Sequence, residues 1–291
     1  MNTSSAGKLT RIACVTAASF LVCAGGAWAQ SSPLGGGGGS SVPNQTQLGQ
    51  SGGTMNDQLQ YGTMGHEVER EQNAAFQAFS KEHDPAKKIQ KGREFLMKYP
   101  KSSFNEQVDA GLMDTYRTQA DWNNEYHYAD QALTLNPNDV DVLATVGWTI
   151  PHVLKPSDTD ADQELDKAEK FAKHAIEVLA ALPKPHDLTE AQFTAAKARR
   201  TYQAHSALGL VYFRRNDYDD SAKELALATK DNPNPDQTDL FVLGADLQNL
   251  SRFGEAADAF GGCAQIAGAL QNQCKQSADA AKRQADVSKA K

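Results

Sequence analysis

The chain has few cysteines and lacks the basic excess typical of nucleic-acid-binding proteins. It contains four cysteines in 291 residues, and two of them, Cys14 and Cys23, lie within the first 29 residues. Acidic side chains outnumber basic ones by 36 to 29, which gives a formal net charge of −7. Because nucleic-acid binders usually carry a basic stripe or patch, this balance argues against a DNA or RNA partner and weakly favours basic partner surfaces.

Sequence motifs of catalysis and metal binding are also absent. The seven histidines show no H-E-x-x-H or other local ligand spacing. Asp158, Asp160 and Asp162 alternate as in a calcium loop, but the glycine of the turn and the closing glutamate are missing. There is no G-x-S-x-G elbow, P-loop or dinucleotide fingerprint. The sequence therefore predicts no enzyme activity, no metal and no cofactor.

The first 29 residues predict a secretory signal peptide. Lys8 and Arg11 precede an apolar run over 12–24, and Ala27 and Ala29 place small residues at the two positions that a signal peptidase reads. A membrane anchor is the alternative, but the run is shorter than the ~20 apolar residues that a span needs. Cleavage after Ala29 predicts an exported protein of bacterial type, periplasmic or secreted, whose net charge changes from −7 to −9.

The rest of the chain divides into a polar leader and a helical part. Residues 30–65 are rich in Gly, Ser, Asn and Gln, with five consecutive glycines at 35–39, and predict a disordered, flexible leader. From 66 onward the apolar residues follow helical spacing. No run in the mature chain is long and apolar enough for a transmembrane segment.

A repeated pair of residues predicts the fold. Leu208-Gly209 and Leu243-Gly244 are separated by 35 residues, and the residues around them match at equivalent offsets. A fixed period of this length predicts an all-α solenoid of stacked helix–turn–helix repeats. We assign it to 66–268 and assign 269–291 to a polar capping helix and tail.

These offsets resemble the tetratricopeptide repeat (TPR) family, whose pattern is W-x₂-L-G-x₂-Y, then A-x₃-F, then P. The resemblance covers about 105–183 and 202–268, with a weaker helix pair before it. It implies large residues that pack the two helices of a unit and small residues where helices approach closely. Residues of the best unit at these positions are Leu208, Gly209, Tyr212, Ser221, Leu225, Ala228 and Pro233.

Several positions depart from the family pattern. Glu125 stands at a small-residue position, and Cys263 stands where alanine is usual. Pro151 removes a backbone donor and is expected to kink or end its helix. The helix of the Leu208 unit is expected to begin early and to run without a break from Ala191 to Arg214, because nothing between them stops a helix.

The resemblance also implies a binding groove. In this family the first helices of the units line a concave face that holds a peptide, and Arg, Trp and Phe dominate such binding sites. Ordinary packing is the alternative, particularly for residues that could fill the gap beside Pro151. The candidate groove residues are Asp114, Arg117, Trp148, His152, Phe213, Arg214, Phe241, Gln248 and Asn249.

Cys263 and Cys274 are the two cysteines that remain after cleavage. A pair of cysteines in an exported chain predicts a disulfide, here between the last repeat and the capping helix. The sequence thus predicts an exported scaffold that binds a protein or peptide in its groove. The alternative is a structural or assembly component of the bacterial cell envelope that acts through its outer surface or its ends.

Overall fold

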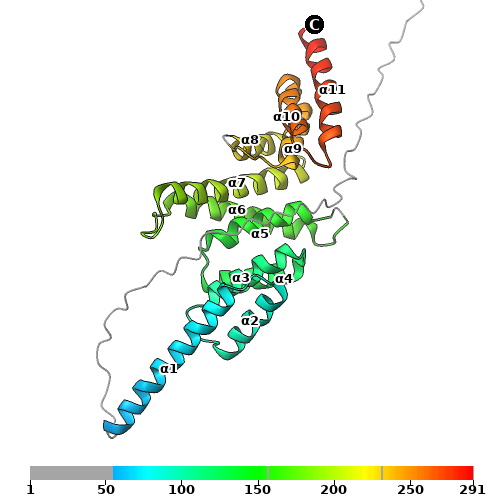
Figure 1. The fold of residues 1–291 in the computed structure, drawn as a ribbon. Coiled ribbons are helices and arrows are strands. Elements are labelled where there is room, and N and C mark those ends of the chain that lie inside the picture. The colour runs from blue at the N-terminus through cyan, green and yellow to red at the C-terminus, as the bar shows by residue number, and fades with distance from the viewer. Residues whose placement is uncertain (1–54, 156, 231, 291) are drawn as a thin grey trace, which may run out of the picture. The chain divides into compact units, whose positions relative to one another are not determined.

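The computed structural model describes residues 55–155, 157–230 and 232–290, and every regular element in them is an α-helix (Figure 1). The predicted signal peptide and most of the predicted leader lie outside the described residues. No helix among the described residues is both long and apolar enough to cross a bilayer. The helices are α1 (Met55–Ser80), α2 (Pro85–Lys98), α3 (Asn105–Thr118), α4 (Trp122–Leu135), α5 (Val140–Val153), α6 (Ala161–Ala181), α7 (Glu190–Arg214), α8 (Tyr218–Thr229), α9 (Gln237–Asn249), α10 (Phe253–Gln265) and α11 (Gln271–Lys289).

The helices form consecutive pairs, which confirms the predicted repeat architecture. In the pairs α3–α4, α7–α8 and α9–α10, one residue of the connecting turn has a left-handed backbone: Ala120 (φ 56°), Asn216 (φ 62°) and Ser251 (φ 60°). In each turn the next backbone N–H bonds a carbonyl of the preceding helix, as in Asp217 N–H to Tyr212 at 2.9 Å. This is the bonding of a Schellman helix end, so the period of the sequence recurs in the backbone.

Small residues sit where the two helices of a pair touch. A Cβ atom added to Gly209 would lie 2.4 Å from Cγ of Leu225, and one added to Gly244 would lie 2.7 Å from the ring of Phe260. The hydroxyl of Ser221, also buried, donates to the carbonyl of Gly209 at 2.8 Å. The Leu-Gly pairs therefore mark points of contact between helices, as the repeat pattern predicts.

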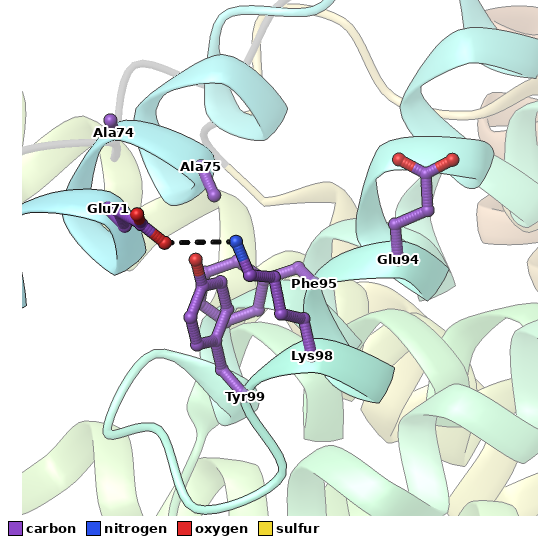
Figure 2. A pocket seen from close by; sticks show the side chains of 7 residues that line it. All are labelled: Glu71, Ala74, Ala75, Glu94, Phe95, Lys98 and Tyr99. Atoms are coloured by element: carbon purple, nitrogen blue, oxygen red, sulfur yellow. Dashed lines mark hydrogen bonds and ion pairs between the residues drawn. The ribbon is translucent and has the colours of Figure 1, made fainter. Parts of the chain in front are cut away.

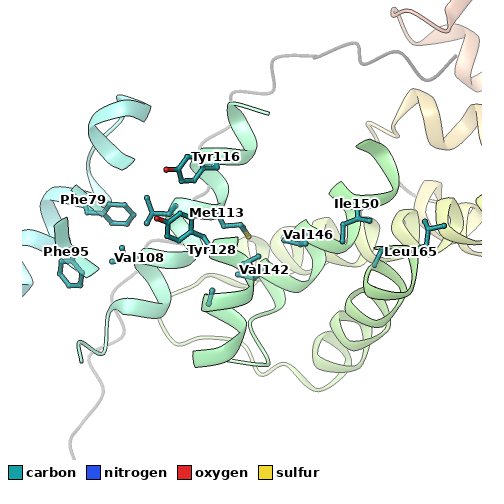
Figure 3. Packing of buried hydrophobic residues seen from close by; sticks show 14 of the residues in the cluster. Phe79, Phe95, Val108, Met113, Tyr116, Tyr128, Val142, Val146, Ile150 and Leu165 are labelled. Atoms are coloured by element: carbon teal, nitrogen blue, oxygen red, sulfur yellow. The ribbon is translucent and has the colours of Figure 1, made fainter. Parts of the chain in front are cut away.

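The hydrophobic core runs continuously through the early repeats. One cluster begins at Phe79 and Phe95 and extends through Met113 to Ile150 and Leu165 (Figure 3). A second cluster lies around Leu225 and Phe260 in the C-terminal repeats. Because Phe79 also contacts the Cβ positions of Gly92 and Gly111, the first helix pair packs onto the second. The first helix pair, α1 and α2, which matches the repeat pattern only weakly, is thus packed against the repeats that follow it.

Helix boundaries agree with the sequence in most places and differ in two. Asp84 caps α2 through a bond from Lys87 N–H, with Pro85 in its first turn, and a Thr189–Gln192 capping box starts the long helix α7. However, α1 begins at Met55, inside the segment predicted as leader. The part of α1 that lies in the leader, 55–65, contains no proline, and its Gln, Leu and Met residues favour a helix despite two glycines.

The helix α5 does not end at Pro151, although the sequence predicts a kink or an end there. The helix continues through Pro151 to Val153. The guanidinium of Arg214 on α7 donates to the carbonyl of Pro151 at 2.7 and 3.1 Å and to that of Leu154 at 3.0 Å. These bonds satisfy carbonyls that have no partner within the end of a helix, which stabilises α5 at its weakest point.

The C-terminal helix is joined covalently to the last repeat. Cys263 of α10 and Cys274 of α11 are both buried and form a disulfide, with their Cα atoms 5.7 Å apart. The side chain of Gln237 at the start of α9 bonds the carbonyl of Ile266 at 2.8 Å and accepts from Leu270 N–H at 3.2 Å. These contacts hold the link between α10 and α11 against α9.

Candidate functional site

The predicted groove residues all lie on first helices of the pairs, α3, α5, α7 and α9, but they do not form one site. Those of α9 are used largely within the protein. The ring of Phe241 lies 5.5 Å from that of Phe260, and Gln248 donates to Gln284 of α11 at 3.1 Å. Asn249, which is exposed, donates to the carbonyl of Ala245 at 3.0 Å. This group joins α9 to α10 and α11.

A second group lies at the C-terminal end of α5. The rings of Trp148 and His152 are 3.9 Å apart, and Nδ1 of His152 bonds the carbonyl of Trp148 at 2.7 Å. Burial lowers the pKa of both His152 and Arg214. Because Arg214 bonds two carbonyls of this helix end, its Nε and Nη2 donors are used within the protein, and its role in binding a peptide stays a prediction. Phe213, its neighbour, packs against Tyr218 at 6.3 Å.

The third group centres on α3, and here arginine side chains gather. Arg117 pairs with Asp114 at 2.7 Å. Arg199 of α7 approaches this pair, and its neighbour Arg200, closely enough for their charges to interact. The buried Arg200 pairs with Asp141 in the first turn of α5 and so joins α7 to α5.

Arg199 differs from its neighbours because it has no ion-pair or hydrogen-bond partner among the described residues. Burial lowers the pKa of Arg199, and the positive charges of Arg200 and Arg117 lower it further. The carboxylates of Asp114 and Asp141 raise it in turn, and each is paired with one of those two arginines, so Arg199 carries the one charge of this group that has no ion-pair partner in the described part of the chain. A negatively charged group placed beside it would gain both charge attraction and hydrogen bonds.

Sequence reasoning missed Arg199 and Arg200 because the groove positions were carried over from the repeat register, which starts later in α7. The signal that points to them is the continuity of the helix. Since α7 begins at Glu190, it presents an additional stretch, 190–201, before the repeat unit. In that stretch Arg200 pairs with Asp141 of α5, and the charge of Arg199 interacts with those of Asp114 and Arg117 on α3.

The histidines were predicted to lack partners for a metal, and this expectation rested on spacing along the chain. In the structure one ligand atom from each of His152, Asp236 and Asp239 lies within 4.8 Å of the other two. Asp236 precedes α9 and Asp239 lies in its first turn. The fold thus brings the end of α5 to the start of α9, a contact that no local motif could reveal.

Two surface pockets lie away from all the predicted groove residues. The first, of about 350 Å³, lies between α1 and α2 and is lined by Phe95, Tyr99 and the ion pair of Lys98 with Glu71 at 3.1 Å (Figure 2). The second, of about 460 Å³, lies among α8, α9 and α10 and includes Leu243 and Leu247. Neither pocket contains a cluster of catalytic groups.

No family model matches the chain, and no curated protein matches it. Among solved structures it is similar to a tetratricopeptide repeat protein from Parabacteroides merdae, with 12% identity, 73% of this chain and 98% of that chain covered, and a TM-score of 0.32. It is also similar to yeast Tom70, with 15% identity and a TM-score of 0.35, over 74% of this chain and 48% of that chain. TM-scores this low support no inference about function, so the fold assignment rests on the helix pairs themselves. By the packing, turns and period of those pairs, the chain is a TPR-like helical-repeat protein.

Proposed function

We propose that the chain is an exported protein-binding scaffold that holds an acidic segment of a partner protein against α3, α5 and α7. The observation that carries this proposal is Arg199, an exposed arginine without an ion-pair partner among the described residues, next to the paired Arg117 and Arg200. An array of helix pairs offers a repeated surface for a peptide, and this position supplies a specific charge on it.

The chemistry of arginine favours a carboxylate at this position. A guanidinium presents its donors in a planar fork that matches a carboxylate with two parallel hydrogen bonds. A bound Asp, Glu or C-terminal carboxylate would also offset the repulsion between Arg199 and the two nearby arginines. The acidic partner differs from the basic one that the net charge suggests, because this position offers one positive charge, that of Arg199, which no carboxylate of the described residues pairs with.

Crosslinking in cells tests the binding surface. A photo-reactive residue in place of the exposed Thr118, next to Arg117, should capture a partner in the wild-type background. Arg199→Ala should reduce that capture about tenfold or more, because an arginine at the centre of an interface often contributes ~2 kcal/mol. Arg252→Ala is the matched control, since that exposed arginine lies directly before α10 and pairs with Glu255 at 2.6 Å.

Two outcomes would contradict the proposal. Equal capture in the Arg199→Ala and wild-type chains would show that the arginine cluster does not bind the partner. A probe at Lys170 on α6 reports on the outer surface, because α6 is the second helix of its pair. Capture only from that probe would favour the alternative function, an assembly component that acts through its outer surface. Both readings require that the variants remain folded, which circular dichroism and thermal unfolding establish.

Export is the second part of the proposal and is supported by the charged, apolar and small-residue segments within 1–29. Cell fractionation with N-terminal sequencing of the purified protein tests it. We expect a mature chain that begins at Gln30. A chain recovered from the cytoplasm with its first residues intact would contradict export and would leave the binding proposal to be judged separately.

A further inference from the structure

Three potential metal ligands meet where α5, α7 and α9 converge. His152 lies in the last turn of α5, while Asp236 caps α9 and Asp239 lies in its first turn. One ligand atom from each lies within 4.8 Å of the others. These residues are widely separated in the sequence, so their meeting is a property of the repeat packing.

The imidazole of His152 is oriented as a metal ligand would be. Its Nδ1 lies 2.7 Å from the carbonyl oxygen of Trp148, and a carbonyl can only accept, so Nδ1 carries the proton. In the neutral ring this leaves a lone pair on Nε2. That atom is out of contact with solvent and has no hydrogen-bond partner. Metal-binding histidines commonly donate their other N–H to a backbone carbonyl in this way.

The two carboxylates are also held in place. Asp239 is fully buried, and its two oxygens accept from the hydroxyls of Tyr202 and Ser206 on α7, each at 2.9 Å. Asp236 accepts from Thr238 N–H at 2.7 Å through one oxygen. Second-layer hydrogen bonds of this kind fix the direction of ligand oxygens and are typical of built metal sites.

We propose that His152, Asp236 and Asp239 bind a divalent transition-metal ion of the Zn²⁺ class. One imidazole and two carboxylates suit such an ion, whereas Ca²⁺ and Mg²⁺ prefer oxygen ligands alone. Two carboxylates would balance its charge. Ligand atoms at ~2.1 Å from one ion stand roughly 3.4 Å apart, so small side-chain rotations, chiefly of the partly exposed Asp236, complete the site.

One positive charge faces this site. Arg214 of α7 lies near enough to His152 for its charge to act on the ring, and it opposes a second cation. Its Nε and Nη2 atoms, however, donate to the carbonyls of Pro151 and Leu154. The bound ion would crosslink the end of α5, just after Pro151, to the start of α9.

Metal binding by the full mature chain without an affinity tag tests the proposal. After removal of metal with a chelator, titration with ZnCl₂ by calorimetry should show one saturable site. Co²⁺ in its place should give a visible absorption band typical of nitrogen and oxygen ligands. Because a ligand that binds only the folded state stabilises it, ZnCl₂ should also raise the unfolding temperature.

Variants locate the site. Asp236→Asn keeps the helix cap, since Asn caps as well as Asp, yet removes a charge, so Zn²⁺ affinity should fall at least tenfold. His152→Gln should abolish saturable binding, and Tyr202→Phe, which removes a bond to Asp239, should weaken it about 10–100-fold. Asp84→Asn, at the cap of α2, and His205→Gln are matched controls that should bind as the wild type does.

Two results would overturn the proposal. The first is the absence of saturable Zn²⁺ binding by the wild-type chain, which would identify the cluster as a set of buried polar groups that share protons. The second is binding that persists unchanged in Asp236→Asn and His152→Gln, which would place the ion elsewhere. The crosslinking result at Arg199 bears on neither, since no variant of this series touches the arginine cluster.

Discussion

At the scale of single residues, Glu125 is the most unusual feature of the fold. It occupies a position where TPR-type repeats place a small residue, its side chain is 0% exposed, and neither carboxylate oxygen has a hydrogen-bond partner. Burial raises the pKa of Glu125 to about 8. Its charged form is therefore costly in the folded chain at neutral pH.

This burial predicts a change of stability with pH. The folded chain binds the Glu125 proton more tightly than the unfolded chain does, so the free energy of unfolding falls as the pH rises from about 4.5 to about 8. Glu125→Gln has no carboxyl group to ionise, so it should not show this fall in the free energy of unfolding. Urea unfolding at several pH values measures the free energy of unfolding of both chains. Relative to the wild type, that of the variant should increase toward pH 8 by on the order of a few kcal/mol.

The exposed Glu94 of α2 supplies the matched control for this experiment. Glu94→Gln should differ from the wild type by a similar small amount at both ends of the pH range. A Glu125→Gln chain that shows no greater gain than this control would mean that the Glu125 carboxylate is solvated or paired in the folded state.

Glycine positions give the second prediction at this scale. Gly209→Ala should destabilise the chain by about 1–3 kcal/mol, because the new methyl group would overlap Leu225. Gly261→Ala, in the middle of α10 with open space around it, should stabilise by about 0.5–1 kcal/mol through helix propensity alone. Denaturant midpoints measured side by side check both. A neutral Gly209→Ala would show that α7 and α8 can separate at little cost.

The contrast between these residues shows what a sequence can reveal. Gly209 and Gly244 were predicted as contact points because a repeat fixes them by position within one unit. Arg199 and the meeting of His152 with Asp239 were not predicted, because they depend on packing between different units. Their identity becomes visible only when the angle and offset of α5, α7 and α9 are known.

At the scale of elements, the turns within the pairs carry a recurring conformational cost. Ala120, Asn216 and Ser251 all adopt left-handed backbones, which are unfavourable for residues other than glycine and, to a lesser degree, asparagine. Ala120→Gly should therefore stabilise the chain by about 1 kcal/mol. Thermal or urea unfolding measures the change.

Asn216→Gly is the control for that prediction. Asparagine tolerates the left-handed region, so this substitution should gain less than Ala120→Gly does. If both changes destabilise equally, the flexibility of glycine in the unfolded chain outweighs the relief of strain, and the turns are not sites of conformational cost.

Helix ends were predictable where a local signal exists. Local signals mark the starts of α2 and α7, because Asp84 precedes Pro85, and Gln192 follows Thr189 by three residues, so these starts were predictable. The start of α1 and the passage of α5 through Pro151 were not. In α5 the missing support comes from Arg214, a residue of another helix, so no pattern within α5 could reveal it.

At the scale of the molecule, stability in an array of repeats depends on each unit and on its neighbours. The described helices contact mainly those adjacent in the chain, apart from contacts between first helices of the pairs, which join α7 to α5 and α9 and join α1 to α3. A substitution in one repeat should therefore destabilise that repeat and its neighbours and leave distant repeats unchanged. The disulfide between Cys263 and Cys274 tests this, because it lies in the last repeat and its capping helix.

Replacement of both cysteines by alanine should lower the stability of this end by about 3 kcal/mol, since the disulfide closes a short loop in the unfolded chain. Hydrogen exchange should then show lost protection in α10 and α11, with α3 and α4 nearly unchanged. The wild-type chain under reducing conditions should behave in the same way, which separates the effect of the bond from that of the substitutions. Equal loss of protection in α3 and α4 would instead mean that the repeats unfold as one cooperative unit. Destabilisation at α11 could affect α3 only if the helices between them, including α5 and α7, were strongly coupled.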